Sequence, residues 1–287
     1  MTTWIERTHD IDTQKVELFT GEGAYHGSTK QKVTSAPQPR IELVTEAKPT
    51  TLERSLEAGI ATIASFEARY ANSLRLVAQL EVPSQEAVRK DGVTFCWCPF
   101  EEAAHRSGPL TRSVLNRMRA GLTGKKRHIY IDSKIQYFEA GDLPVDSCLW
   151  HVDGSIAIRD QRVLPFGASV LHDLRARLEH EDPPRYLAYQ SSGHCATEFL
   201  AEPISLHLPE LIPNFNGFDA AVRAAGALDL AHPAGAILAY DGNTIHRAIQ
   251  PVSAGWRLWI RCTETDVEIN PSEATIACYG TVFRPHR

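Results

Sequence analysis

Three side chains of the kinds that bind transition metals lie in the second half of the chain. His151 and Asp153 are two residues apart in the run LWHVDG, and His246 follows the turn-like run DGNT. On a strand, residues two apart project to the same face, so one ion can contact His151 and Asp153 while Val152 points away. His246, at the start of another predicted strand, is the candidate third ligand. Two imidazoles and one carboxylate leave coordination positions open, so these residues predict a catalytic metal centre.

The residues after His246 make this pattern more specific than an H-x-D pair alone, which 12 histidines and 35 acidic residues can produce by chance. Pro251, Gly255, Arg257 and Arg261 follow at five, nine, eleven and fifteen positions. With the H-x-D pair, this spacing resembles the Fe(II)/2-oxoglutarate-dependent dioxygenase superfamily. In that family a long insertion separates H-x-D from a second histidine, and an arginine lies about ten residues further on.

The resemblance covers roughly residues 128–265 and implies a double-stranded β-helix, which is a jelly-roll, cupin-like fold. It implies that His151, Asp153 and His246 are the catalytic metal ligands, with Fe(II) as the metal, 2-oxoglutarate as co-substrate and O2 as oxidant. The implied activity is hydroxylation, desaturation or cyclisation at an unactivated C–H bond, with release of succinate and CO2. Related halogenases have a small residue in place of the carboxylate, so Asp153 favours a hydroxylase.

The same resemblance implies where 2-oxoglutarate binds. Arg257 is expected to hold its 5-carboxylate, because a guanidinium forms two parallel charge-assisted hydrogen bonds to a carboxylate. Alternation along the strand 256–265 places Arg257 and Arg261 on one face. We expect Arg261 to contact the 1-carboxylate or an acidic group of the substrate. Gln136 and Thr197, on neighbouring predicted strands, are further candidates for polar contacts to 2-oxoglutarate.

The elements that must position these residues are predicted from periodicity. A long helix is expected over residues 51–80 and a second over 109–122, because apolar residues recur there at helical spacing. From residue 128 onward, short strands separated by Gly, Pro, Asp and Asn favour a sandwich or barrel. The expected strands are 129–138, 147–153, 185–190, 197–200, 236–240 and 256–265, with helices at 169–179 and 219–225. The predicted fold class is mainly β with helices (α+β).

Length and composition set the remaining expectations. The chain has 287 residues, 43% apolar and 23% charged, with a net charge of −5. This composition is typical of a globular protein, and it offers no overall positive field for nucleic acid or an anionic membrane. We expect one oxygenase domain (1–287) with an N-terminal helical or mixed extension (1–127), a β-helix core with the metal site (128–265) and a C-terminal segment (266–287). The expected location is cytoplasmic, without membrane contact.

A small polar metabolite, such as an amino acid or a natural-product intermediate, is the expected substrate, and the oligomeric state stays open. Three alternatives stay open too. A non-redox metal enzyme on a cupin scaffold would keep the triad without needing Arg257. A nucleic-acid-directed oxygenase would use the basic stretch from Arg112 to Arg127, for which a solvated helix face is the default interpretation. A binding protein without turnover would need none of the ligands.

Overall fold

The computed structural model describes residues 64–145, 148–153, 172–180, 182–212, 214–271 and 276, and within them the chain is mainly β with a few helices. In chain order the elements are β1 (Ser65–Tyr70), β2 (Arg75–Gln79), α2 (Gln85–Lys90), β3 (Cys98–Pro99), α3 (Phe100–Arg106), α4 (Pro109–Arg119), β4 (His128–Phe138), β5 (His172–Asp173), α5 (Leu174–His180), β6 (Arg185–Gln190), β7 (Thr197–Leu200), β8 (Ile204–Pro209), β9 (Leu211–Ile212), α6 (Asn216–Ala225), β10 (Asp229–Ala231), β11 (Ala236–Asp241), β12 (His246–Ala248) and β13 (Gly255–Thr265).

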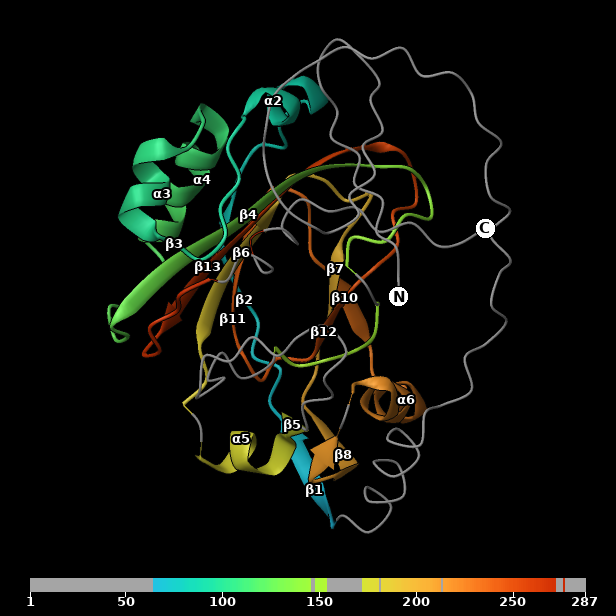
Figure 1. Cartoon of the computed structure of the whole chain (residues 1–287). Helices are drawn as coiled ribbons and strands as arrows, with labels where there is room; N and C mark the ends of the chain where they lie inside the picture. Colours follow the sequence, from blue (N-terminus) through green and yellow to red (C-terminus); the bar gives the residue numbers. More distant parts are fainter. Residues whose placement is uncertain are drawn as a thin grey trace, which may run out of the picture.

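The largest sheet has six antiparallel strands in the order β2-β11-β6-β13-β4-β3. Its two long strands, β13 and β4, pair from Gly255↔Phe138 to Thr265↔His128. Helices α3 and α4 cover one face of this sheet (Figure 1). Buried side chains of both helices and of four strands form the largest apolar cluster there: Phe100, Ala103, Val114, Leu115, Met118, Ile131, Leu187, Tyr189, Ile237, Ala239, Leu258, Ile260 and Cys262.

The opposite face of the six-stranded sheet looks toward a three-stranded antiparallel sheet, in the order β10-β7-β12 (Figure 1). Side chains of the two sheets meet between them: the Phe199 ring of β7 lies 4.9 Å from the Tyr240 ring of β11, centroid to centroid. An isolated antiparallel bridge between His151 and His246 adds the segment 148–153 to the free edge of β12. The space between the sheets is therefore where the predicted ligands lie.

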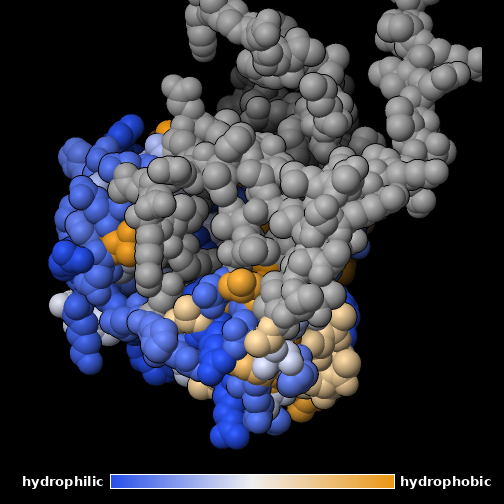
Figure 2. All heavy atoms as spheres, turned by 60° about the horizontal axis from the view of Figure 1, so that its bottom comes forward, coloured by the Kyte–Doolittle hydropathy of each residue, from blue (hydrophilic) through white to orange (hydrophobic). Residues whose placement is uncertain are grey.

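A third group of elements packs below these sheets in Figure 1. The pairs β1-β8 and β5-β9 lie with α5 and α6 around a second apolar cluster. Trp150 and Val152 of the segment 148–153 are buried in the same cluster, which anchors that segment from its outer side. Figure 2 shows this end of the molecule, where hydrophilic residues cover much of the described surface and apolar residues gather on one side.

Most predicted elements after residue 100 are confirmed. The strands 185–190 and 197–200 have the predicted bounds, and β4, β11 and β13 differ from the prediction by one residue at one end. The helix predicted over 109–122 ends at Arg119, and the one predicted over 219–225 begins three residues earlier, at Asn216. The helix predicted at 169–179 is α5, Leu174–His180, preceded by the short strand β5. None of the described helices is long and apolar enough to cross a membrane.

The long helix predicted over residues 51–80 is wrong in its described part, which forms β1 and β2 instead. Residues 51–63, and the predicted N-terminal strand at 41–44, lie outside the described residues. Phe66 and Tyr70 fit helical spacing, but with Ala68 they also fit the two-residue alternation of a strand, and Ala68 and Tyr70 are the buried residues of β1. Asn72, with a φ of 48°, then turns the chain between the two strands.

The prediction of a continuous strand over 147–153 is also wrong. The described residues 148–153 form only the single bridge at His151. The alternation that motivated the prediction is nevertheless present, because Trp150 and Val152 point into the outer apolar cluster. His151 and Asp153 are left on the inner side.

Candidate metal centre

His151, Asp153 and His246 converge on one point between the two sheets. One ligand atom from each residue can be chosen so that all three lie within 4.8 Å of one another, and Nε2 of His246 is 3.7 Å from Oδ1 of Asp153. The backbones of His151 and His246 exchange two hydrogen bonds of 3.0 Å, which fixes the two histidines side by side. The predicted third ligand, 95 positions from His151 in the sequence, is thus a direct neighbour in space.

Both histidines present the same ring nitrogen to the centre. Nδ1 of His151 lies 2.8 Å from the carbonyl oxygen of Leu149, and Nδ1 of His246 lies 2.9 Å from that of Thr244. A carbonyl oxygen only accepts hydrogen bonds, so each Nδ1 donates its proton, and in a neutral ring this leaves the Nε2 lone pair for a metal ion. This second hydrogen bond is the arrangement that orients metal-binding histidines in proteins.

Asp153 is held by two arginines. Nη1 of Arg261 donates to both carboxylate oxygens, at 3.2 and 3.3 Å, and Nη2 of Arg177 donates to the Asp153 carbonyl oxygen. Nη2 of Arg261 also lies 3.4 Å from Asp132, which is fully buried. Burial raises the pKa of Asp153, but the nearby positive charges, Arg261 foremost, together lower it below its usual value. The carboxylate is therefore ionised and available to a cation.

His246 is kept neutral by its surroundings. The side chain is buried among the rings of Phe199 and Tyr240, each 5.7 Å away, and of His151 at 4.5 Å. Burial lowers the pKa of His246 to about 4, and the attraction of Asp153 offsets only part of that effect. A neutral imidazole is the form that binds a metal ion, so no proton has to be displaced from His246 near neutral pH.

Arg257 lies on the same face of β13 as Arg261, as the alternation predicted. It is 4% exposed, and its guanidinium lies 4.9 Å above the Phe138 ring. Nη2 donates to Oε1 of Gln136 and Nη1 donates to the carbonyl oxygen of Cys195, both at 3.1 Å. Burial lowers the pKa of Arg257. Among the described residues it has no carboxylate partner, and Nε has no hydrogen-bond acceptor.

The other predicted contacts are distributed along this inner surface. Gln136 is buried and bound to Arg257. Thr197 shares the inner face of β7 with Phe199, and its backbone N–H donates to Gln190. Arg261 pairs with Asp153 and Asp132, so it orients the carboxylate of the candidate ligand Asp153. Its expected contact to the 1-carboxylate of 2-oxoglutarate or to an acidic group of the substrate stays a prediction.

Sequence reasoning missed two residues of the site. Asp132 lies on the same strand face as Gln136, four residues earlier, so alternation was a sufficient signal for it. Arg177 lies on α5, beyond the H-x-D segment, and reaches Asp153 through its backbone carbonyl. No pattern in the sequence marks that contact.

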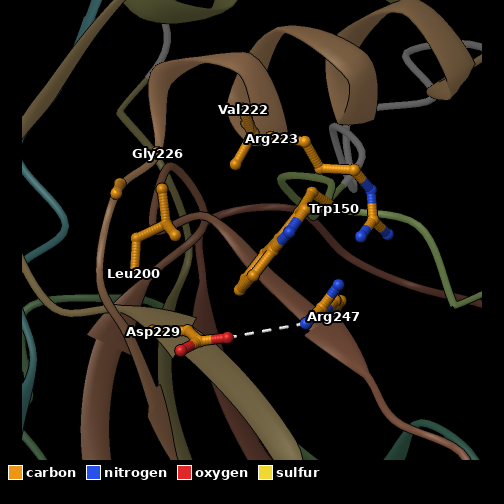
Figure 3. Close-up of a pocket in the computed structure, with 8 residues that line it drawn as sticks. Trp150, Leu200, Val222, Arg223, Gly226, Asp229 and Arg247 are labelled. Atoms are coloured by element: carbon orange, nitrogen blue, oxygen red, sulfur yellow. Dashed lines mark ion pairs between the residues drawn. The ribbon is translucent and has the colours of Figure 1, made fainter.

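The outer side of the H-x-D segment is clamped by α6 and β12 (Figure 3). The backbone N–H of Trp150 donates to Asp219 at 2.9 Å, and the Arg247 guanidinium lies 4.4 Å from the Trp150 ring. These residues, with Arg223 and Asp229, border a cavity of about 190 Å³ behind the segment. Trp150 and Arg247 are the chain neighbours of His151 and His246, so this packing fixes two of the three candidate ligands.

The basic stretch between α4 and β4 is largely paired internally. Arg112 donates to the carbonyl oxygens of Ala104, His105 and Ser107. Arg119 pairs with Glu101, Lys126 with Asp182 and Asp266, and Arg127 with Asp266. Charges committed to these partners do not form a phosphate-binding row, which supports the solvated-surface interpretation over a nucleic-acid contact.

Comparison with known proteins adds no assignment: no protein-family model matches the chain, and no curated protein matches it. The case for a function depends on the site itself.

Proposed function

We propose that this protein is a non-haem Fe(II)/2-oxoglutarate-dependent oxygenase that hydroxylates, desaturates or cyclises a small polar metabolite. The observation that carries the proposal is the convergence of His151, Asp153 and His246, with both Nε2 atoms freed by hydrogen bonds at Nδ1. Two histidines and one carboxylate are the facial ligand set of this class of iron enzyme. A structural zinc site would instead be closed by four protein ligands, and no fourth joins this group among the described residues.

The path of the chain between the two facing sheets supports a jelly-roll core. The six-stranded sheet contains β4, β6, β11 and β13, and the three-stranded sheet with its bridged segment contains 148–153, β7, β10 and β12. In chain order these elements alternate between the two sheets, except that β7 and β10 follow each other within the three-stranded sheet. Repeated crossing between two antiparallel sheets is how a double-sheet jelly roll is built. In such a fold, strand ends from both sheets surround the interior where the triad lies.

The residues of this chain would hold the reactants as follows. Fe(II) bound by the triad would, with 2-oxoglutarate and O2, supply the oxidising power for attack on an unactivated C–H bond, yielding succinate and CO2. Arg261 holds the Asp153 carboxylate in place. The rings of Phe199 and Tyr240 keep water from His246.

Arg257 would receive the 5-carboxylate of 2-oxoglutarate. It is four residues from Arg261 along one face of β13, about 13 Å at the usual rise of a strand, which a five-carbon diacid together with the two side chains can bridge. A buried guanidinium without an acidic partner is costly unless an anion joins it. The Gln136 amide and the Cys195 carbonyl hold the guanidinium in position for that anion.

The test is succinate release from 2-oxoglutarate by the Fe(II)-loaded full chain in air, with and without a panel of small polar metabolites. We expect release that requires Fe(II) and that is abolished in His151→Ala, Asp153→Ala and His246→Ala, because each variant removes a ligand. His105→Ala, an exposed histidine on α3, is the matched control. Full activity in any ligand variant would refute the site. Metal binding without consumption of 2-oxoglutarate would point instead to a non-redox, cupin-type enzyme.

A further inference from the structure

Two arginines stand apart among the described residues because their side chains are more than nine-tenths buried: Arg257, at 4% exposure, and Arg177, at 7%. Neither forms an ion pair with a described residue. Burying a charge without a paired counter-charge is unfavourable, so each site favours an anion supplied from outside the chain. The charge of Arg177 helps lower the pKa of Asp153, but that carboxylate is already paired with Arg261. The proposed function provides one for Arg257, in the 5-carboxylate of 2-oxoglutarate. It provides none for Arg177.

Arg177 lies directly beside the metal centre. It projects from α5 and donates a hydrogen bond through Nη2 to the carbonyl oxygen of Asp153, one of the proposed ligands. Its Nε and Nη1 have no acceptor in the part of the chain that the structure describes. A guanidinium carries five N–H donors, so donors of Arg177 remain for a further ligand.

The hydroxyls of two tyrosines near Arg177 are also buried without a hydrogen-bond partner among the described residues. Tyr70 of β1 is 2% exposed and Tyr186 of β6 is fully buried, and neither hydroxyl has a hydrogen-bond partner among the described residues. Burial raises the pKa of both hydroxyls. The charge of Arg177 offsets part of that rise at Tyr70, and at Tyr186, where Asp153 adds to the rise, Arg261 and then Arg177 offset part of it. Both therefore stay protonated and can donate. Buried donors without acceptors are rare in folded proteins and often mark a binding site.

An apolar wall joins these donors to the metal centre. The Tyr70 ring lies 5.7 Å from the Phe218 ring, Phe218 lies 5.6 Å from Phe215, and Phe215 lies 5.8 Å from the His151 ring. On the other side, the Tyr186 ring lies 5.2 Å from that of Tyr240, with the two ring planes 43° apart, and the Tyr240 ring lies 5.7 Å from that of His246. Tyr70 and Phe218 are buried within the second apolar cluster, whereas Phe215 and His151 are only partly buried, so the carbon skeleton of a molecule held by Arg177 would lie against these last two rings.

We propose that Arg177, with the hydroxyls of Tyr70 and Tyr186, binds an oxyanionic group of the substrate, so that the substrate of the proposed oxygenase is a small organic acid. That the bound anion is the substrate of an oxygenase rests on the proposed function, but anion binding at this site does not require iron or 2-oxoglutarate. A carboxylate, a sulfate and a phosphate share the chemistry that these donors recognise, since each presents several acceptor oxygens to charge-assisted hydrogen bonds.

A purely structural role for Arg177 predicts a different behaviour on substitution. If the residue served only to anchor the Asp153 carbonyl, its removal would destabilise the fold. If its buried charge waits for a ligand, replacing it with an apolar side chain of similar length should leave the free energy of unfolding equal or higher, because the desolvation cost disappears. Only if Arg177 binds a ligand, therefore, should its replacement weaken anion binding without lowering the free energy of unfolding.

The experiment titrates the metal-free full chain with sodium acetate, sodium sulfate and inorganic phosphate at constant ionic strength, followed by calorimetry. We expect the wild type to bind at least one of these probes and Arg177→Met to bind it at least about tenfold more weakly. The urea midpoint of that variant should be no lower than that of the wild type. Arg175→Met, an exposed arginine on the same helix, should behave like the wild type, and Arg177→Lys, which keeps the charge, should retain part of the binding.

Equal binding in the wild type and Arg177→Met would overturn the proposal. So would a lower urea midpoint in Arg177→Met together with no binding in a folded Arg177→Lys. Preference for acetate would assign the substrate to the carboxylic acids, and preference for sulfate or phosphate to the corresponding esters. Because no step of this test uses iron or 2-oxoglutarate, a failure of the proposed oxygenase activity would appear in the succinate assay and not here.

Discussion

Single residues determine how tightly the proposed centre would hold its reactants, and Arg257 allows the clearest test. Arg257→Met removes the buried cation but leaves the triad intact, because Arg257 contacts Gln136 and Cys195 and none of the three ligands. Losing charge-assisted hydrogen bonds of this kind should raise the 2-oxoglutarate concentration needed for half-maximal turnover by about tenfold or more. The measurement is succinate formation against 2-oxoglutarate, with metal affinity by calorimetry as the control. A weaker metal affinity with an unchanged 2-oxoglutarate requirement would contradict this role.

Much of the site at this scale follows from the two-residue alternation of extended chain. It placed His151 and Asp153 together with Trp150 and Val152 on the far side, and it placed Arg257 and Arg261 on one face of β13. The Nδ1 hydrogen bonds to Leu149 and Thr244 could not be predicted, because they depend on how each ring turns within its segment. The pairing of Arg261 with Asp153 depends on the separation of two chain segments in space and was missed for the same reason.

At the scale of elements, α6 supports the candidate metal centre from outside. Asp219 on α6 accepts a hydrogen bond from the backbone N–H of Trp150 and pairs with Arg223 at 2.6 Å. Asp219→Ala should let the segment 148–153 shift and weaken metal affinity by about tenfold, the lower end of the effect seen for residues that orient ligands. Calorimetry with Co(II) measures it. Asp229→Ala, which removes only a 3.5 Å ion pair with Arg247 at the cavity (Figure 3), should weaken the affinity less. An equal loss in both variants would argue against this support.

A second element, α4, is capped by a residue distant in sequence. Asp91 accepts hydrogen bonds from the backbone N–H groups of Leu110 and Thr111, at 2.7 and 2.9 Å, and from the Thr111 hydroxyl. Asp91→Ala would leave these donors at a buried helix start without an acceptor, at a cost of about 2 kcal/mol. A lower urea midpoint with unchanged metal affinity is the expected result, since α4 lies on the far face of the sheet from the triad. Glu86→Ala, an exposed acid, is the control.

The strands after residue 128 were easier to predict than the segment 65–79, which the sequence predicted as a helix and which forms β1 and β2. The reason is physical. In β6, β7 and β13 the turn residues at both ends leave room for nothing longer than a strand. Just before β1 the sequence has no such turn residues, and the spacing of Phe66 and Tyr70 fits both the 3.6-residue period of a helix and the two-residue alternation of a strand. Pairing of β1 with β8, more than 130 positions away, decides between them, and local spacing contains no information about that partner.

At the scale of the whole molecule, two facing sheets and their buried interior determine how the protein responds to pH. His232 and His246 are both buried, and burial lowers the pKa of each to about 4. An unfolded histidine has a pKa near 6.5, so below that pH the unfolded chain binds protons that the folded chain does not. The free energy of unfolding should therefore be at its full value above about pH 6.5, fall as the pH drops toward 4, and stop falling on this account below 4.

His232 permits a test away from the metal ligands. Its Nε2 lies 3.0 Å from the carbonyl oxygen of Ala236, and a shift from 6.5 to about 4 corresponds to about 3 kcal/mol of stability lost across that interval. In His232→Gln, which can still donate to that carbonyl but does not titrate, the decline between pH 6.5 and 4 should be smaller by about that amount. Urea midpoints measured in the presence of a chelator give the comparison, with the exposed-histidine variant His105→Gln expected to follow the wild type. Parallel curves for the wild type and His232→Gln would show that His232 is not held neutral in the fold.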